Sequence, residues 1–174
     1  MSPIARIFER GGTVGPEARW NPTPAELTQE PLRFVLEFWL ELARGGPPHL
    51  RQVDPLLLRP ALGYLMLLDA VDGGHDFRYR LYGSRIARIS TFDMTGKLLS
   101  AHPASAYATE FAIASSRAAL ARRQPLLTSR RPAAAEFTSR WPRLALPLVD
   151  DQGVACRLLA VTVAVGHDGK MVKG

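Results

Sequence analysis

Cysteine is nearly absent from this 174-residue chain, which contains only Cys156. A single cysteine cannot form an internal disulfide, and it leaves no cysteine cluster for a structural zinc site. Long hydrophobic runs are missing too, because the longest, 64–69 and 158–165, fall far short of the ~20 residues of a membrane helix. The first residues include Glu9 and no apolar stretch of signal-peptide length. These absences lead us to expect a cytoplasmic protein without a membrane segment.

Motifs of catalytic and metal chemistry are missing as well. Ser84, Ser115 and Ser116 lie outside any Gly-x-Ser-x-Gly context, and no glycine loop suited to phosphate follows an expected strand. No pair of His, Asp or Glu residues has the spacing of a metal site. We therefore expect no metal site and no enzymatic activity.

Acidic residues are scarce in one part of the chain. The net charge of +6 comes entirely from a stretch with one acidic residue, Glu136, and seven arginines: Arg117, Arg122, Arg123, Arg130, Arg131, Arg140 and Arg143. Such a basic patch favours an acidic protein, nucleic acid or anionic lipid as partner. Arg130 and Arg131 are neighbours in an expected strand and face opposite sides, so the seven cannot form one patch. A nucleic-acid-associated regulator is therefore the alternative function, and nucleic acid is not the favoured partner.

The rest of the composition is that of one globular domain. Apolar residues make up 47% and charged residues 22% of the chain, and a chain of this length buries about 70% of its unfolded surface in a single core. Residues 1–22 are rich in glycine and proline and are expected to be a flexible leader. Residues 23–165 form the domain, and 166–174 read as a polar tail.

Two longer helices are expected. In the first, 31–44, charged residues form one narrow stripe, so its apolar surface is wider than one contact with its own domain requires. We expect the excess apolar surface to contact a homodimer mate or another signalling protein through Leu32, Val35, Phe38 and Trp39. The second helix runs from about 105 to 123 and is rich in alanine.

Five segments have the character of strands: 63–71, 77–82, 126–131, 141–149 and 154–165. Turn residues at 72–76 and 150–153 join neighbouring strands into hairpins. A hairpin near each end with helices between them predicts an α+β fold. In this fold a five-stranded antiparallel sheet has helices across one face, preceded by an N-terminal amphipathic helix.

Three segments add a family resemblance to this pattern. They are DPLLLRPALGYLMLLDAV at 54–71, DFRYRLYGSRI at 76–86 and DMTGKLL at 93–99. In this order and spacing they resemble a bacterial, alphaproteobacterial family of single-domain PAS-like proteins, and the resemblance covers about 31–165. It implies the PAS fold and a role in bacterial signal transduction, through sensing of small molecules or cofactors or through protein contacts.

The resemblance also implies structural roles for motif residues, namely Arg80, Gly83, Ser84, Asp93 and Gly96. The second strand must leave the sheet and enter a short helix, so Gly83 would supply backbone freedom and Ser84 the helix cap. We expect Arg80 to form an ion pair with Asp69 or Asp93.

A ligand cavity is one interpretation of the apolar residues between sheet and helices, and a filled core is the default one. The cavity would be lined by Tyr79, Tyr107, Phe111, Leu144, Leu146 and Cys156. Photochemical flavin adducts need a cysteine in an Asn-Cys-Arg motif, which is missing here. Among the four histidines only His102, just before the long helix, is placed to ligate haem, although a solvated or capping histidine is the more ordinary interpretation. The cofactor and the ligand are left unassigned.

Overall fold

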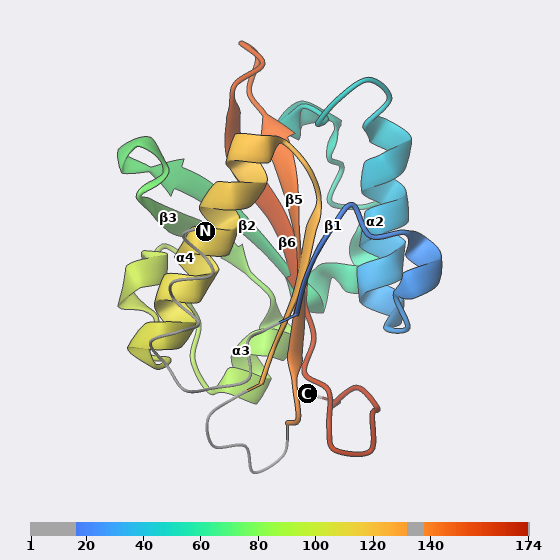
Figure 1. Cartoon of the computed structure of the whole chain (residues 1–174), viewed down its shortest axis with the longest axis vertical. Helices are drawn as coiled ribbons and strands as arrows, with labels where there is room; N and C mark the ends of the chain where they lie inside the picture. Colours follow the sequence, from blue (N-terminus) through green and yellow to red (C-terminus); the bar gives the residue numbers. More distant parts are fainter. Residues whose placement is uncertain (1–16, 132–137, 174) are drawn as a thin grey trace.

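The computed structural model describes residues 17–131 and 138–173, and it contains one antiparallel sheet of six strands (Figure 1). The order across the sheet is β1-β4-β5-β6-β2-β3. The strands are β1 (Glu17–Trp20), β2 (Leu65–Val71), β3 (Asp76–Tyr82), β4 (Leu126–Arg130), β5 (Trp141–Val149) and β6 (Ala155–Thr162). The expected α+β class is therefore confirmed, with one strand more than predicted.

The additional strand, β1, lies inside the stretch predicted to be a flexible leader. Residues Glu17–Trp20 pair antiparallel with β4, and the Arg122 guanidinium lies 4.4 Å from the centroid of the Trp20 ring. The leader prediction is thus wrong for 17–20, while 1–16 lie outside the described residues. Both expected hairpins are present, since β2 pairs with β3 and β5 with β6.

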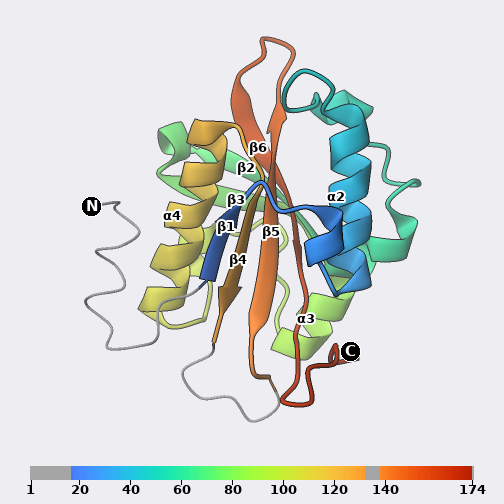
Figure 2. The same ribbon diagram turned by 45° about the vertical axis from the view of Figure 1, so that its right-hand side comes forward.

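Helices cover both faces of the sheet rather than one. The helix α2 (Glu30–Leu42) contacts β5 and β6 on one face, and α4 (Ala106–Arg122) contacts β4, β5 and β6 on the other. Figures 1 and 2 show these two helices on opposite sides of the strands. The short helix α3 (Ser84–Ser90) follows β3, and the remaining turns are 3-10 helices: η1 (Pro24–Glu26), η2 (Leu50–Gln52), η3 (Arg59–Tyr64), η4 (Asp72–Gly74) and η5 (Leu99–Ala101).

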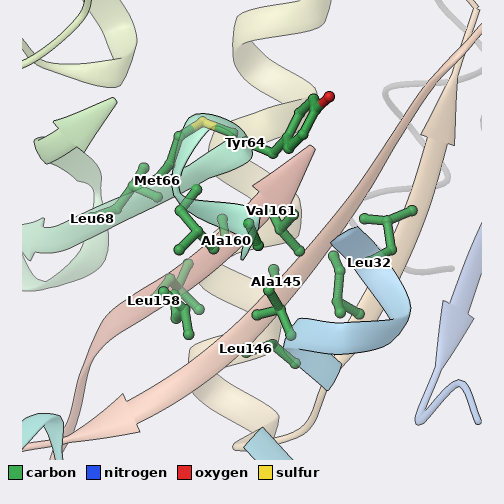
Figure 3. Close-up of a cluster of buried hydrophobic side chains, with 14 of the residues drawn as sticks. Leu32, Tyr64, Met66, Leu68, Ala145, Leu146, Leu158, Ala160 and Val161 are labelled. Atoms are coloured by element: carbon green, nitrogen blue, oxygen red, sulfur yellow. The ribbon is translucent and has the colours of Figure 1, made fainter. Parts of the chain in front are cut away.

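The apolar stripe of α2 belongs to the protein's own core. Leu32 and Val35 are fully buried, and the Trp39 indole N–H donates a 2.9 Å hydrogen bond to the Pro147 carbonyl of β5. Figure 3 shows Leu32 of α2 and Leu146 of β5 among the side chains of this core. The prediction that Leu32, Val35 and Trp39 face a partner is therefore wrong. Phe38 is only half-buried, and homodimerisation stays a prediction.

A β-bulge changes which residues of β3 face the core. Leu68 pairs with Tyr79 and Leu67 with Leu81, so Arg80 is the additional residue between them. In a regular strand Leu81 would share the core-facing side with Phe77 and Tyr79. After the bulge, Tyr82 is buried and Leu81 is 38% exposed.

Arg80 makes the ion pair that was expected of it, and its partner is Asp69. The Arg80 Nε atom lies 2.7 Å from one Asp69 oxygen, and Arg157 Nε lies 2.7 Å from the other. Asp69 therefore joins β3, β2 and β6 through side chains, on the face of the sheet away from α4.

Gly83 is required for close packing and not for backbone freedom. Its φ of −58° is open to any residue, but a Cβ atom there would collide with the Gly63 carbonyl oxygen and lie 2.9 Å from that of Leu65. Gly83 is itself the N-cap of α3, so Ser84 is the first helical residue, and the predicted cap by its hydroxyl is wrong.

The Asp-x-Thr-Gly motif forms a turn beside β3. Asp93 Oδ1 accepts hydrogen bonds from the Thr95 backbone N–H at 2.8 Å and from its hydroxyl at 2.7 Å, and these bonds lower the pKa of Asp93. Gly96 has a φ of +80°, and its N–H donates to the Tyr79 carbonyl. The motif therefore positions Tyr79.

The predicted polar tail folds back on the domain through Met171, which packs against the core and bridges to Val165. Within 17–131 and 138–173, no helix is both long and apolar enough to cross a membrane.

Candidate functional site

A cavity of about 270 Å³ lies between the sheet and the α3 and α4 side of the molecule. Its lining comes from the inward positions of β2, β3, β4, β5 and β6, from α3 and α4, and from the segment between those helices. Such a space between sheet and helices favours the cavity interpretation over a completely filled core.

One part of the cavity is aromatic. Tyr79 and Tyr82 meet edge to face with ring centroids 5.2 Å apart, and Phe92 lies 6.3 Å from Tyr82. The His102 ring meets Phe92 edge to face at 4.9 Å. Tyr82 lines the cavity only because the bulge at Arg80 turns it inward. These rings, with Phe111 of α4, form a wall suited to an apolar or aromatic ligand.

Another part of the lining is polar and basic. Arg143 of β5 lies directly across from Thr128 of β4 and Thr162 of β6. Its Nη2 atom donates a 3.0 Å hydrogen bond to the hydroxyl of Ser116 in α4. Arg130 is two residues from Thr128 on the same face of β4. Two guanidinium groups therefore share one wall.

The electrostatics follow from burial. Burial lowers the pKa of Arg143 and of Arg130 because it penalises their charged forms. Burial raises the pKa of Tyr79, and the nearby charge of Arg143 partly opposes that change. Among the described residues no Asp or Glu lines the cavity. The positive charge on this wall thus has no carboxylate beside it in the described lining.

His102, the histidine that the sequence singled out as a possible haem ligand, lines the cavity. Its Nδ1 atom accepts a 3.1 Å hydrogen bond from the Ala104 N–H, and burial, followed by the charge of Arg130, lowers its pKa. The hydrogen bond to Nδ1 and the lowered pKa both favour the neutral imidazole that a metal ligand requires. The cavity does not fit haem, however, because about 270 Å³ is below even the ~300–1,000 Å³ of pockets for drug-sized ligands.

The other predicted lining residues divide into two groups. Tyr79 and Phe111 do line the cavity. Leu144 and Leu146 are fully buried and alternate with Arg143, so they face α2 on the opposite side of the sheet, and their assignment was wrong. Cys156 lies at the β5–β6 hairpin, with its Sγ atom 3.9 Å from an Asp150 oxygen, and was also misassigned.

Tyr107 is likewise outside the described lining and lies near Arg130, where its phenol opposes the lowering of the Arg130 pKa. Besides Tyr79, the described structure brings His102 and Phe111 to one site as predicted. Clusters of three or more His, Cys, Asp or Glu residues that could hold a metal are not found in the described part of the chain.

The seven arginines of the basic region do not form one surface. Arg117 donates to the Gly74 and His75 carbonyls at 2.8 and 3.1 Å, and Arg123 donates to the Gly153 carbonyl at 2.8 Å. These three bonds join α4 and its C-cap to two different hairpins. Arg122 stacks on Trp20, and Arg130 and Arg143 line the cavity, which leaves Arg131 and Arg140 as exposed strand-end residues.

Sequence reasoning missed several lining residues. Ser115, which lines the cavity, and Ser116, which accepts the hydrogen bond from Arg143, were considered only as nucleophiles. Thr128 and Thr162 were not considered at all. One signal in the sequence could have revealed them. Thr128 and Arg130 are polar and occupy alternate positions of one strand, so they share the face of that strand that a helix could cover. Such positions normally hold apolar residues, so polar side chains there indicate a polar cavity.

Comparisons with protein-family models, with curated proteins and with solved structures gave no match to this chain.

Proposed function

We propose that this protein is a PAS-like sensory domain of bacterial signal transduction, which binds a small molecule in the cavity and acts on a protein partner. The observation that carries this proposal is the cavity itself, whose lining combines the aromatic rings of Tyr79, Tyr82 and Phe92 with the guanidinium groups of Arg130 and Arg143. Small-molecule sites commonly combine an apolar lining with a few placed polar groups. A core without a ligand has little reason to enclose guanidinium groups.

The order of the elements supports the PAS-like part of the proposal. Leaving β1 aside, the strands run β4-β5-β6-β2-β3, so the first and last hairpins meet at β2 and β6. The helices α3 and α4 lie between the two hairpins in sequence, as the resemblance implies. The motif residues at Asp69, Arg80 and Gly96 brace β3, which carries Tyr79 and Tyr82 into the cavity.

A native mass spectrum of freshly purified protein, recorded beside its denatured mass, tests the proposal. We expect additional mass that disappears on denaturation. Ala112 of α4 lines the cavity, so Ala112→Phe should remove the additional mass by filling the space. Ala118 lies on the same helix outside the lining and provides a matched control, because Ala118→Phe should retain the ligand.

Two results would contradict the proposal. One is an additional mass that survives Ala112→Phe, because the ligand would then bind elsewhere. The other is the absence of any non-covalent mass, both as purified and after incubation with the small-molecule fraction of a bacterial lysate.

The described geometry does not favour the nucleic-acid alternative. Arg117, Arg122 and Arg123 hold other parts of the fold, and Arg143 lines the cavity, so they do not share one phosphate-binding face.

A further inference from the structure

The Arg143 side chain is the least ordinary group in the interior of this protein. The residue as a whole is half-buried, but its Nη1 atom is buried and has no hydrogen-bond partner among the described residues. Its Nη2 atom has only the neutral hydroxyl of Ser116 as a side-chain partner. Buried guanidinium groups are normally paired with a carboxylate, because an unpaired buried charge is costly. The described protein does not supply that carboxylate.

The surroundings of Arg143 add to the positive charge. Arg130 lies two residues along β4 from Thr128, the direct cross-strand neighbour of Arg143, so the two guanidinium groups occupy diagonal positions on one face. Placing like charges together is unfavourable unless an anion lies between or beside them. His102 lines the same cavity, and neither form of its imidazole supplies the negative charge that would compensate the two guanidinium groups.

The size and lining limit which anion fits. Most of the cavity is bounded by aromatic and aliphatic side chains, among them Met66, Tyr82, Phe92 and Phe111. A phosphate group would demand many donors and would place a dianion against this apolar lining, whereas one carboxylate needs only the fork of a single guanidinium. The remaining lining then matches an apolar body.

We propose that the ligand of this cavity is a small carboxylic acid with an apolar body, and that Arg143 binds its carboxylate. The inference rests on the proposed ligand-sensing function and gives it a chemical class. The carboxylate accepts hydrogen bonds from the Arg143 guanidinium, while the apolar body lies along Tyr79, Tyr82 and Phe92. Ser116 orients the guanidinium through its hydrogen bond to Nη2.

Arg143 could instead have a structural role and hold β5 to α4 through Ser116. The two roles predict opposite changes in the melting temperature of the ligand-free protein when Arg143 is replaced. If the role were structural, Arg143→Met would lower the melting temperature, because the hydrogen bond is lost. If the guanidinium is held for a ligand, the same variant removes an uncompensated buried charge and raises the melting temperature. Circular dichroism of the variant, recorded with the melting curve, verifies that it is folded.

The binding experiment uses matched pairs of acids and amides: octanoate with octanamide, and 3-phenylpropionate with 3-phenylpropionamide. Isothermal titration calorimetry with the full chain measures each affinity. We expect at least one acid to bind about tenfold or more tightly than its amide, because hydrogen bonds to a charged group are the stronger ones. Arg143→Met should remove that preference, while Arg143→Lys, which keeps the charge, should retain part of it.

Arg140→Met is the matched control, since Arg140 is exposed, lies three residues away and is outside the cavity lining. Its affinity should stay within about twofold of the original protein. Glu136, which is outside the described residues, is a carboxylate of the chain itself, and Glu136→Gln should also leave the affinity unchanged. Tighter acid binding by Glu136→Gln would show that the chain provides its own anion and would overturn the proposal.

The remaining outcomes separate this proposal from the one on which it rests. Equal binding of acids and amides, an acid preference that survives Arg143→Met, or a co-purified ligand without an acidic group would overturn the carboxylate assignment and leave ligand sensing intact. If neither acids nor amides bind and the native mass spectrum shows no ligand, both proposals fail.

Discussion

A single arginine illustrates how the same residue changes meaning between sequence and structure. In the sequence Arg143 is one of seven arginines in a basic stretch. In the fold it is an inward-facing residue of β5, between Thr128 and Thr162 and below Ser116 of α4. Composition alone cannot distinguish these two environments, because local alternation assigns a face to a residue without stating what covers that face.

A second single residue, His102, should make the free energy of unfolding depend on pH. Its pKa in the folded protein is lowered, so below the unfolded value of about 6.5 the unfolded chain binds more protons than the folded one. The contribution of His102 is therefore fully present above that pH and is lost as the pH falls towards the folded pKa. Urea unfolding at about pH 7, 6 and 5 measures this dependence.

The variant His102→Asn should flatten the dependence, since an amide oxygen can still accept the hydrogen bond from the Ala104 N–H but does not titrate. Exposed His167 is the control, and His167→Asn should leave the curve unchanged. If His102→Asn showed the original slope, another group would have to be responsible.

Among the elements, α2 differs most from its expected role. Its stripe of apolar residues was assigned to a partner, but the sheet face opposite α4 is apolar as well, and α2 covers it. We expect Trp39→Ala to lower the free energy of unfolding by about 3–5 kcal/mol, because it opens a space in the core and removes the bond to Pro147.

Phe38→Ala, next to it on the half-buried side, should cost only roughly 1 kcal/mol. Chemical denaturation of both variants compares the two faces of the helix directly. Equal losses would contradict the assignment of Trp39 to the intramolecular core. Because Phe38 is not part of the buried core, a substitution there tests the oligomeric state without the loss of stability expected at Trp39.

The junction between β3 and α3 depends on a backbone contact. A methyl group at position 83 would collide with the Gly63 carbonyl, so we expect Gly83→Ala to lower the free energy of unfolding by about 1–3 kcal/mol. The strain arises between elements and not from the φ angle. Gly73, with a φ of +67° and open space around its Cβ position, is the control for conformational strain alone.

Gly73→Ala should cost only about 1 kcal/mol, measured by the same denaturation experiment. A larger loss at position 73 than at 83 would mean that backbone conformation, and not close packing, explains the glycine before α3.

At the scale of the whole molecule, one sheet separates two different interiors. Figure 2 shows α2 and α4 on opposite sides of the strands. The α2 side is a core of apolar side chains that includes Leu144 and Leu146, whereas the α4 side also encloses aromatic, hydroxyl and guanidinium groups around a cavity. The Asp69 ion pairs, on the α2 side, connect β3, β2 and β6 away from the cavity. The cavity and its polar groups therefore lie on the α4 face, while buried apolar side chains pack on both faces of the sheet.

Much of the local structure could be predicted from the residues. The limits of β5 coincide with the expected 141–149, and the turn residues at 72–76 and 150–153 do form hairpins. Hydrophobic period and turn chemistry are local properties, so they can be recognised without knowing the fold. The strand β1 was missed because four residues, preceded by glycine and proline and followed by proline, carry too little periodicity.

By itself the sequence determined the succession of helices and strands from α2 onward and the two hairpins, because these follow from neighbours along the chain or across one turn. It left the partner of Arg80 open between Asp69 and Asp93. Only the tertiary structure decided which layer covers each face of the sheet, how the bulge at Arg80 turns Tyr82 inward, and where Arg130 and Arg143 come together. These features depend on contacts between residues far apart in sequence, and a single register shift exchanges the two faces of a strand.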